Sequence, residues 1–456
     1  MELAKAVRDG TLELICPEME LLVCPGYHDV ALKGAGVIRA DNLGRLYFRL
    51  ISPFEGGGVP HASLRPSKGP GELYEREDYV MLRAVDEFGR EWRSNWIVVD
   101  LRYDIPFPNY RVRKNLANIM HSATRRKRDH SYVQMLIPRS PPIPFDMITE
   151  GVRTAGDRPI RRSSSLDHHA HRIGDAEVTF RREEDGWLSV SATRPGCFMP
   201  TWPGLICHAL GFVTAQTITP AVIKRAFNES EHFGLFSGPF WRFSSVMPGP
   251  VRFVGPEGAD DFWRFVELFL QYIQQNELES EPLLEEFAGI RRGAQGSFQT
   301  ACLTLAVGIE SIAKLVLKNE SPPTLCHEVL RGLIRHIDAW PGDGALKERA
   351  KGALGRLAEI STADLLYAWA TRTAVQHELV DRWKRLRNPK AHGNVLDQEQ
   401  AGHDLYYSTV ELLNRIVATT IGYDGPILPT SRRGWTLDTE NNDQPQPPIE
   451  PSESTE

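Results

Sequence analysis

The residues best suited to chemistry in this chain lie in the stretch "WKRLRNPKAHGNVLD", residues 383–397. It contains Arg387 and, five residues later, His392. Arginine offers planar, permanently charged, bidentate recognition of phosphate, and histidine can take up and release protons near neutral pH. Held together, the two side chains suit cleavage of an RNA phosphodiester. In that reaction a base removes the 2′-OH proton and a cation stabilises charge on the phosphate.

The sequence before this pair predicts a helix that carries Arg387 at the edge of its apolar face. That face comprises Leu379, Val380, Trp383 and Leu386. Pro389 disfavours helical geometry at Asn388, so the helix is expected to end or kink there. Residues five apart in an unbroken helix point about 140° apart. A break would instead let Arg387 and His392 converge.

A carboxylate upstream is a candidate partner for this pair. Glu310 lies in the predicted helix "SFQTACLTLAVGIESIAKLVL". The apolar positions three, four or seven residues away from it are Leu303, Ala306, Val307, Ala313 and Leu317. An unpaired carboxylate on an apolar face is costly, so we expect Arg387 or His392 to pair with Glu310.

The segment "RNPKAHG" resembles the RNxxxH signature of HEPN domains, which are helical-bundle ribonucleases common in bacterial defence and toxin systems. As in that family, a helix with a polar residue, here in "GIES", precedes the motif by several tens of residues. The segment "IGYDGPILPTSRRGW", residues 421–435, resembles the end of HEPN domains of the ApeA type, which also follow a β-rich domain. The helical resemblance covers roughly residues 259–435, and that of the N-terminal half is architectural only.

The resemblance implies a function and a set of roles. Arg387 and His392 would be catalytic, Asn388 would support them, and Glu310 would be their helical partner. The expected activity is an endoribonuclease that needs no metal or other cofactor, acts on RNA (tRNA among the candidates), and forms a homodimer with its two motifs facing one another. A self-toxic effector of anti-phage defence, with a phage-derived trigger bound by the N-terminal domain, would fit this activity.

Other interpretations stay open. The helical domain could be a non-catalytic dimerisation or binding module, or a partner of a nucleotidyltransferase. Arg387 and His392 could then be a surface ion pair and a helix-terminal cation, and Glu310 a structural salt bridge. The histidines of "DHHAHR", residues 167–172, have no second cluster at ligand spacing, so a flexible loop is favoured over a metal site. The adjacent pairs Cys207-His208 and Cys326-His327 are read as core or near-core residues.

The remaining sequence predicts an α+β multidomain protein, with an irregular β-rich N-terminal domain over residues 1–255 and an all-α, HEPN-type helical bundle over residues 259–435. Short β-rich runs, an Asp-Gly hairpin signal in "EEDGWLSV" and dense Pro and Gly support the first domain. One helix is expected there, around residues 218–230. The expected strand runs are "LELIC", "LYFRLI", "NWIVVDL", "SYVQMLI", "AEVTF", "WLSVSA" and "VRFV".

Helical periodicity begins at Asp260 and continues to about Tyr423. Asp397 and Gln400 form a capping signal for the last helix. The predicted helices cover residues 259–276, 296–319, 323–338, 345–359, 362–387 (broken once) and 397–421.

The distribution of charge along the chain favours a nucleic-acid partner more than the net charge does. The formal net charge is −6, but residues 437–456 contribute six acidic side chains and no basic one, which leaves 0 for the rest. That Pro-rich tail is expected to be disordered. Residues 111–182 hold fifteen Lys or Arg against seven Asp or Glu, a local net charge of +8 that could follow RNA phosphates or simply form solvated loops.

The location of the protein is inferred from what the sequence lacks. The six cysteines have no paired short spacing, which favours reduced thiols over a disulfide framework. We read no signal peptide at the start and no apolar run near the ~20 residues of a membrane span. A cytoplasmic protein without a membrane partner is therefore expected.

Overall fold

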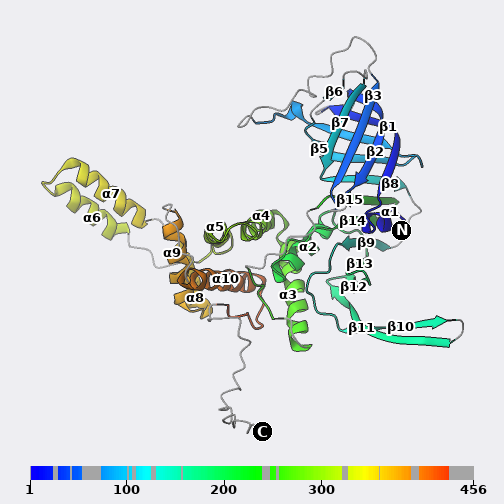
Figure 1. The fold of residues 1–456 in the computed structure, drawn as a ribbon. Coiled ribbons are helices and arrows are strands. Elements are labelled where there is room, and N and C mark those ends of the chain that lie inside the picture. The colour runs from blue at the N-terminus through cyan, green and yellow to red at the C-terminus, as the bar shows by residue number, and fades with distance from the viewer. Residues whose placement is uncertain are drawn as a thin grey trace, which may run out of the picture. The chain divides into compact units, whose positions relative to one another are not determined.

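A computed structural model gives the architecture of the chain (Figure 1). The structure describes residues 2–23, 29–41, 44–53, 73–99, 102–104, 109–124, 130–155, 158–227, 229–238, 247–252, 256–320, 327–358, 360–391 and 400–430.

The chain divides into two compact units. The first comprises Met1–Ser297 with Val417–Pro426, and the second Phe298–Ile416 with the chain from Ile427 onward. The first unit contains a large antiparallel sheet and the second contains helices, so an α+β protein with a β-rich N-terminal half is confirmed. The predicted tail, residues 437–456, lies outside the described residues.

Fifteen strands form one sheet in the order β10-β11-β12-β13-β9-β14-β15-β8-β5-β4-β1-β2-β3-β7-β6, and every neighbouring pair is antiparallel. The strands are β1 (Glu13–Val23), β2 (Val30–Ala40), β3 (Leu46–Pro53), β4 (Val80–Val85), β5 (Glu91–Ile97), β6 (Arg102–Asp104), β7 (Asn109–Leu116), β8 (Asn118–Thr124), β9 (His130–Ile137), β10 (Met147–Ala155), β11 (Arg158–Ile173), β12 (Ala176–Arg182), β13 (Leu188–Pro195), β14 (Val222–Phe227) and β15 (Ser230–Phe236).

The first half of the sheet folds over a single core. Strands β5 and β7 are separated in the sheet by four others, yet Trp92 of β5 and Val112 of β7 belong to one buried cluster with Phe48 of β3 and Leu21 of β1. The sheet must therefore coil so that its inward-facing side chains meet. Burial alternates along β3, as expected for a strand with one face on the core and one outside.

Helix α3 (Pro256–Gln275) packs on the second half of the sheet at β11, and helix α2 (Trp202–Val213) packs against α3. Helix α2 is apolar almost all round and is accordingly buried along nearly its whole length. Trp263 of α3 packs on Phe180 of β12, with ring centroids 4.6 Å apart. Phe212 of α2 stacks on Phe269 of α3 at 5.6 Å. This packing explains why α3 belongs to the sheet's unit and not, as the sequence suggested, to a helical domain beginning at residue 259.

Several predictions for the N-terminal half of the chain are confirmed and others are wrong. Six of the seven expected strand runs overlap strands, and the Asp-Gly signal is the turn between β12 and β13, with Gly186 at φ 82°. In the seventh run, Val251 and Arg252 are not in a strand and the rest lies outside the described residues. The expected helix at 218–230 is wrong: the β-forming residues around Val222 make the hairpin β14–β15 instead. Helices α1 (Glu2–Arg8) and α2 were not predicted.

The C-terminal helices follow the predicted periodicity closely. They are α4 (Glu277–Ala294), α5 (Phe298–Val316), α6 (His327–Ala339), α7 (Gly344–Ala358), α8 (Thr362–Thr373), α9 (His377–Ala391) and α10 (Gln400–Ile421). The expected break in residues 362–387 occurs at Ala374, which has φ 56°. Helix α4 was missed because Pro282 and its mixed charges obscure the pattern. The capping residue Asp397 lies outside the described residues.

By length and composition, α5 alone among the helices searched in the described part of the chain could cross a membrane. The expected absence of a membrane-spanning segment stays a prediction. Core helices of soluble proteins meet the same criterion, and eight residues of α5 are buried in this structure.

Candidate functional site

The motif-bearing helix α9 is fixed to α5 by its apolar face. Leu379, Val380, Trp383 and Leu386, the residues predicted to form that face, are all buried. Trp383 also donates a hydrogen bond from Nε1 to the backbone carbonyl of Ala306 in α5, at 3.0 Å. A buried indole N–H usually finds such a partner. This bond sets the position of α9 along α5 one turn before Arg387.

Arg387 and Glu310 meet across the two helices. Nε of Arg387 donates to Oε2 of Glu310 at 2.8 Å, and the guanidinium carbon lies 5.9 Å from the centroid of the Trp383 ring. The expected pairing of Glu310 with Arg387 is therefore present. The side chains are 22% and 39% exposed respectively. Within the described part of the chain, the guanidinium of Arg387 makes its hydrogen bond through Nε, and no described residue accepts one from its two Nη groups.

Lys314 completes a cluster that the sequence analysis did not include. Its Nζ lies 3.1 Å from Oε1 of Glu310, so each carboxylate oxygen contacts one cation. In the sequence, the spacing of four residues between Glu310 and Lys314 could have predicted this contact, because such residues are neighbours on a helix. Burial alone would raise the pKa of Glu310, but the hydrogen bonds from Lys314 and Arg387 outweigh it and hold that pKa below its ordinary value. One carboxylate and two cations leave a net positive charge.

Of the other two predicted site residues, Asn388 is described only in its backbone, and His392 is not among the described residues. The helix was expected to end or kink at Asn388; α9 continues through Asn388 and Pro389 to Ala391, so an end at Asn388 is wrong. A proline removes one backbone donor and crowds the preceding turn, but here helical geometry persists beyond it. The side chain of Asn388 and the whole of His392 lie outside the described residues. Their assigned roles stay predictions, as do the catalytic roles of Arg387 and Glu310.

The face of α5 beside the cluster is partly apolar and exposed. Of the five apolar positions around Glu310, Ala306, Ala313 and Leu317 are buried. Leu303 and Val307 are instead 42% and 50% exposed. At spacings of four, three and four residues, Leu303, Val307, Glu310 and Lys314 follow one another along a single side of the helix. The single apolar face expected around Glu310 is thus divided between the core and the surface.

The histidines of "DHHAHR" lie in strand β11 and not in the expected loop. His169 is buried and stacks on Trp263, with centroids 4.1 Å apart and planes within 7°. Nε2 of His171 contacts Glu267 at 3.3 Å. Among the described residues, no group of three or more His, Cys, Asp or Glu could hold a metal ion. These histidines therefore help to attach α3 to the sheet.

Of the two adjacent Cys-His pairs, the described one, Cys207-His208, shows no sign of nucleophilic chemistry. Burial raises the pKa of the Cys207 thiol to about 12, and an un-ionised thiol is a poor nucleophile. Burial, with Arg291 nearby, lowers the pKa of His208 to about 4. Cys207 is a core residue and His208 is partly buried, as predicted. Cys326 lies outside the described residues, and His327 begins α6.

Comparison with known proteins gives no family to which the chain can be assigned. No family model, no curated protein and no solved structure matches it. The function must therefore be argued from the site itself.

Proposed function

We propose that this protein is a HEPN-type endoribonuclease that cleaves RNA by attack of the 2′-OH without a metal ion. The observation that carries the proposal is the Arg387–Glu310 contact, 2.8 Å between Nε and Oε2, at the start of the "RNPKAH" motif. A carboxylate that engages only one edge of the guanidinium fixes its direction and leaves the Nη groups for a phosphate.

Each residue has a defined role in this reaction. His392 removes the proton from the ribose 2′-OH, and the 2′-oxygen attacks the adjacent phosphorus. The bond from phosphorus to the 5′-oxygen breaks, and that oxygen takes up a proton from the solvent or from a protonated histidine. The products are a 2′,3′-cyclic phosphate and a 5′-hydroxyl end. Arg387 stabilises the developing phosphate charge, Glu310 positions Arg387, and Asn388 supports them.

Because α9 is helical to Ala391, the chain must turn after that residue for His392 to face the same phosphate as Arg387. A second copy of the chain could instead supply the histidine. The exposed apolar side chains Leu303 and Val307, beside Glu310 on α5, support a homodimer through this face, because burying them would be favourable.

The proposed biological role is a toxic effector in anti-phage defence, with RNA as substrate and the N-terminal unit binding a trigger.

The test is cleavage of total cellular RNA by the purified full chain in excess EDTA, with mapping of the RNA ends. We expect discrete cuts with 2′,3′-cyclic phosphate ends from the wild type and none from His392→Ala. His336→Ala is the matched control, because His336 is an exposed histidine of α6 in the same unit. Equal cutting by His392→Ala and wild type would remove this histidine from the mechanism.

The rival function is a binding or dimerisation module in which Glu310, Lys314 and Arg387 are only a structural ion-pair cluster. Their partial exposure is compatible with this role. Mild overexpression separates the two: an active ribonuclease should arrest growth, and Arg387→Ala should relieve the arrest. A partner of a nucleotidyltransferase would instead copurify with, or be modified by, such an enzyme.

A further inference from the structure

The outward face of the neighbouring strands β3 and β7 carries three arginines, Arg49, Arg111 and Arg113. In β3, Phe48 and Leu50 are buried, so Arg49 between them points away from the core, as do Tyr47 and Ile51. Val112 is likewise buried in β7, which places Arg111 and Arg113 on the outward face. We call Tyr47, Arg49, Ile51, Arg111 and Arg113 the arginine surface.

Two of these arginines face each other directly. Arg49 is the cross-strand neighbour of Arg113, and Ile51 is the neighbour of Arg111. Among the residues that the structure describes, no carboxylate forms an ion pair with Arg49 or Arg113. The guanidinium carbon of Arg113 lies 4.8 Å from the centroid of the Tyr47 ring. Like charges directly opposite one another destabilise a sheet, so this arrangement would be relieved by an anionic ligand.

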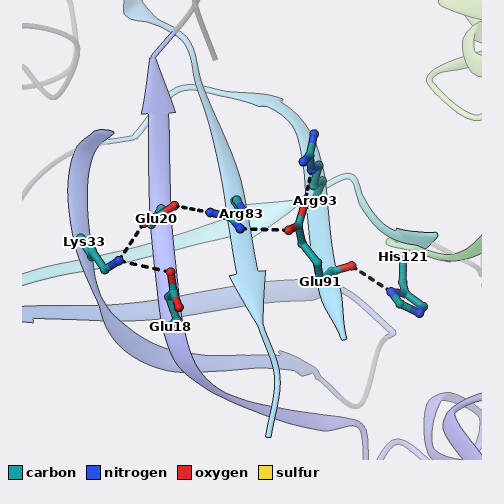
Figure 2. A network of polar contacts seen from close by, with 7 residues as sticks. All are labelled: Glu18, Glu20, Lys33, Arg83, Glu91, Arg93 and His121. Carbon is teal, nitrogen blue, oxygen red and sulfur yellow. Dashed lines mark hydrogen bonds and ion pairs between the residues drawn. The ribbon is translucent and has the colours of Figure 1, made fainter. Parts of the chain in front are cut away.

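A neighbouring part of the same sheet neutralises its charges, as Figure 2 shows. Glu20 contacts both Lys33, at 3.0 Å, and Arg83, at 2.9 Å. Glu91 contacts Arg83 at 3.0 Å and Arg93 at 2.7 Å. With Glu18 on Lys33, this network contains three acids and three bases across β1, β2, β4 and β5.

On the strand next to the arginine surface, Arg39 is paired with Glu13. Among the described residues of β1 to β5 and β7, the arginines that face each other without a carboxylate partner are Arg49 and Arg113.

We propose that the arginine surface binds single-stranded nucleic acid. Such sites combine positive charge along the backbone path with aromatic and apolar platforms for unpaired bases. Tyr47 and Ile51 lie beside Arg49 along the same face of β3. Ile51 is exposed, and so is Ile15 of β1, which shares this face through Val37. A duplex hides its bases from a sheet face of this kind. The proposal does not depend on the catalytic site, because neither Arg387 nor His392 takes part in it.

The experiment measures fluorescence anisotropy of labelled oligouridine, oligodeoxythymidine and duplex RNA, each of about 20 nucleotides per strand, longer than one typical binding site. The full chain carries His392→Ala throughout, so that the RNA is not cut, and oligodeoxythymidine has no 2′-OH to attack. The test variant adds Arg49→Gln and Arg113→Gln. The control adds Arg93→Gln, which removes an arginine of the same sheet that is paired with Glu91.

We expect single strands to bind and the test variant to lose two phosphate contacts. With a salt exponent of roughly 0.7 per contact, its affinity at about 100 mM salt should be about 25-fold weaker. Its loss of affinity between about 50 and 200 mM salt should be about sevenfold smaller than that of the parent. The control should bind like the parent. Oligouridine and oligodeoxythymidine should both bind, and the tighter of the two identifies RNA or DNA as the ligand.

Three results would overturn the proposal. The parent could fail to bind either single strand at about 50 mM salt, a concentration at which electrostatic contacts are little screened. The control could lose as much affinity as the test variant, or polyglutamate could compete as well as the nucleic acids do. Thermal melting curves of both variants show whether each is folded. A negative result here would leave the ribonuclease proposal standing, and a chain without nuclease activity would still be expected to bind.

Discussion

Substitution of Trp383 by phenylalanine should loosen the attachment of α9 to α5 and misplace Arg387. Trp383 is almost completely buried, and its Nε1 donates to the carbonyl of Ala306 at 3.0 Å. Phenylalanine keeps an aromatic ring in the core but has no N–H and is smaller. Because Arg387 follows one helical turn later, its aim at Glu310 depends on the position that Trp383 gives to α9.

The magnitude follows from the two interactions that are lost. A neutral hydrogen bond contributes roughly 0.5–1.5 kcal/mol, and the incompletely filled volume costs about 1–2 kcal/mol more. The free energy of unfolding of the helical unit should thus fall by about 1.5–3.5 kcal/mol. For a unit of this size the melting temperature should fall by about 5–10 °C. If the chain is a ribonuclease, Trp383→Phe should cut the same RNA sites more slowly.

Differential scanning calorimetry of the full chain, with RNA cleavage in parallel, measures both effects. Trp340→Phe is the matched control, because Trp340 is 45% exposed and its replacement should change the stability by less than about 0.5 kcal/mol. Melting of Trp383→Phe at the wild-type temperature would refute the assigned role of this side chain. An equal fall in the melting temperature of Trp340→Phe would also refute that role.

Three other predictions concern charge and association. Glu310→Gln should lower the free energy of unfolding by less than about 1 kcal/mol at neutral pH and slow RNA cleavage. Because the folded-state pKa of Glu310 is lowered, its contribution to stability should be present above the ordinary pKa of 4.5 and lost as pH falls through the folded-state pKa. Melting curves against pH should show this loss for the wild type only. Val307→Glu should dissociate a dimer formed through α5, measured by sedimentation, whereas Val329→Glu on α6 should not; an unchanged mass would exclude that face. Arg49→Gln should raise the stability by roughly 0.2–1 kcal/mol by removing a like-charge neighbour, and a lower melting temperature would contradict this.

The parts of the site that sequence could predict are those governed by helical spacing. The apolar face of α9 follows from positions three and four residues apart, and each of its four members is buried. The pairing of Glu310 with Arg387 followed from the cost of leaving a charge unpaired on an apolar face. Lys314 could have been found in the same way, since it is four residues from Glu310.

Other features depend on tertiary contacts that spacing does not reveal. The segment around Val222 can be read as helix or strand, and pairing of β14 with both β9 and β15 decides for the strand. His169 is buried only because Trp263, far along the chain, stacks on it. Pro389 was expected to end or kink α9, but a proline near a helix end removes only one hydrogen bond, and the helix extends to Ala391.

The comparison of two arginine environments shows why a charge count along the sequence is a weak guide to function. Arg387 and Arg49 belong to the same chain, whose formal net charge is −6. The fold gives Arg387 a carboxylate that fixes one edge of its guanidinium. It gives Arg49 another arginine as its direct neighbour. The first arrangement suits orientation of a single phosphate, and the second suits attraction of a phosphate backbone. If both proposals hold, substitution of Arg387 should slow cleavage with little effect on the salt dependence of binding, whereas substitution of Arg49 should do the reverse.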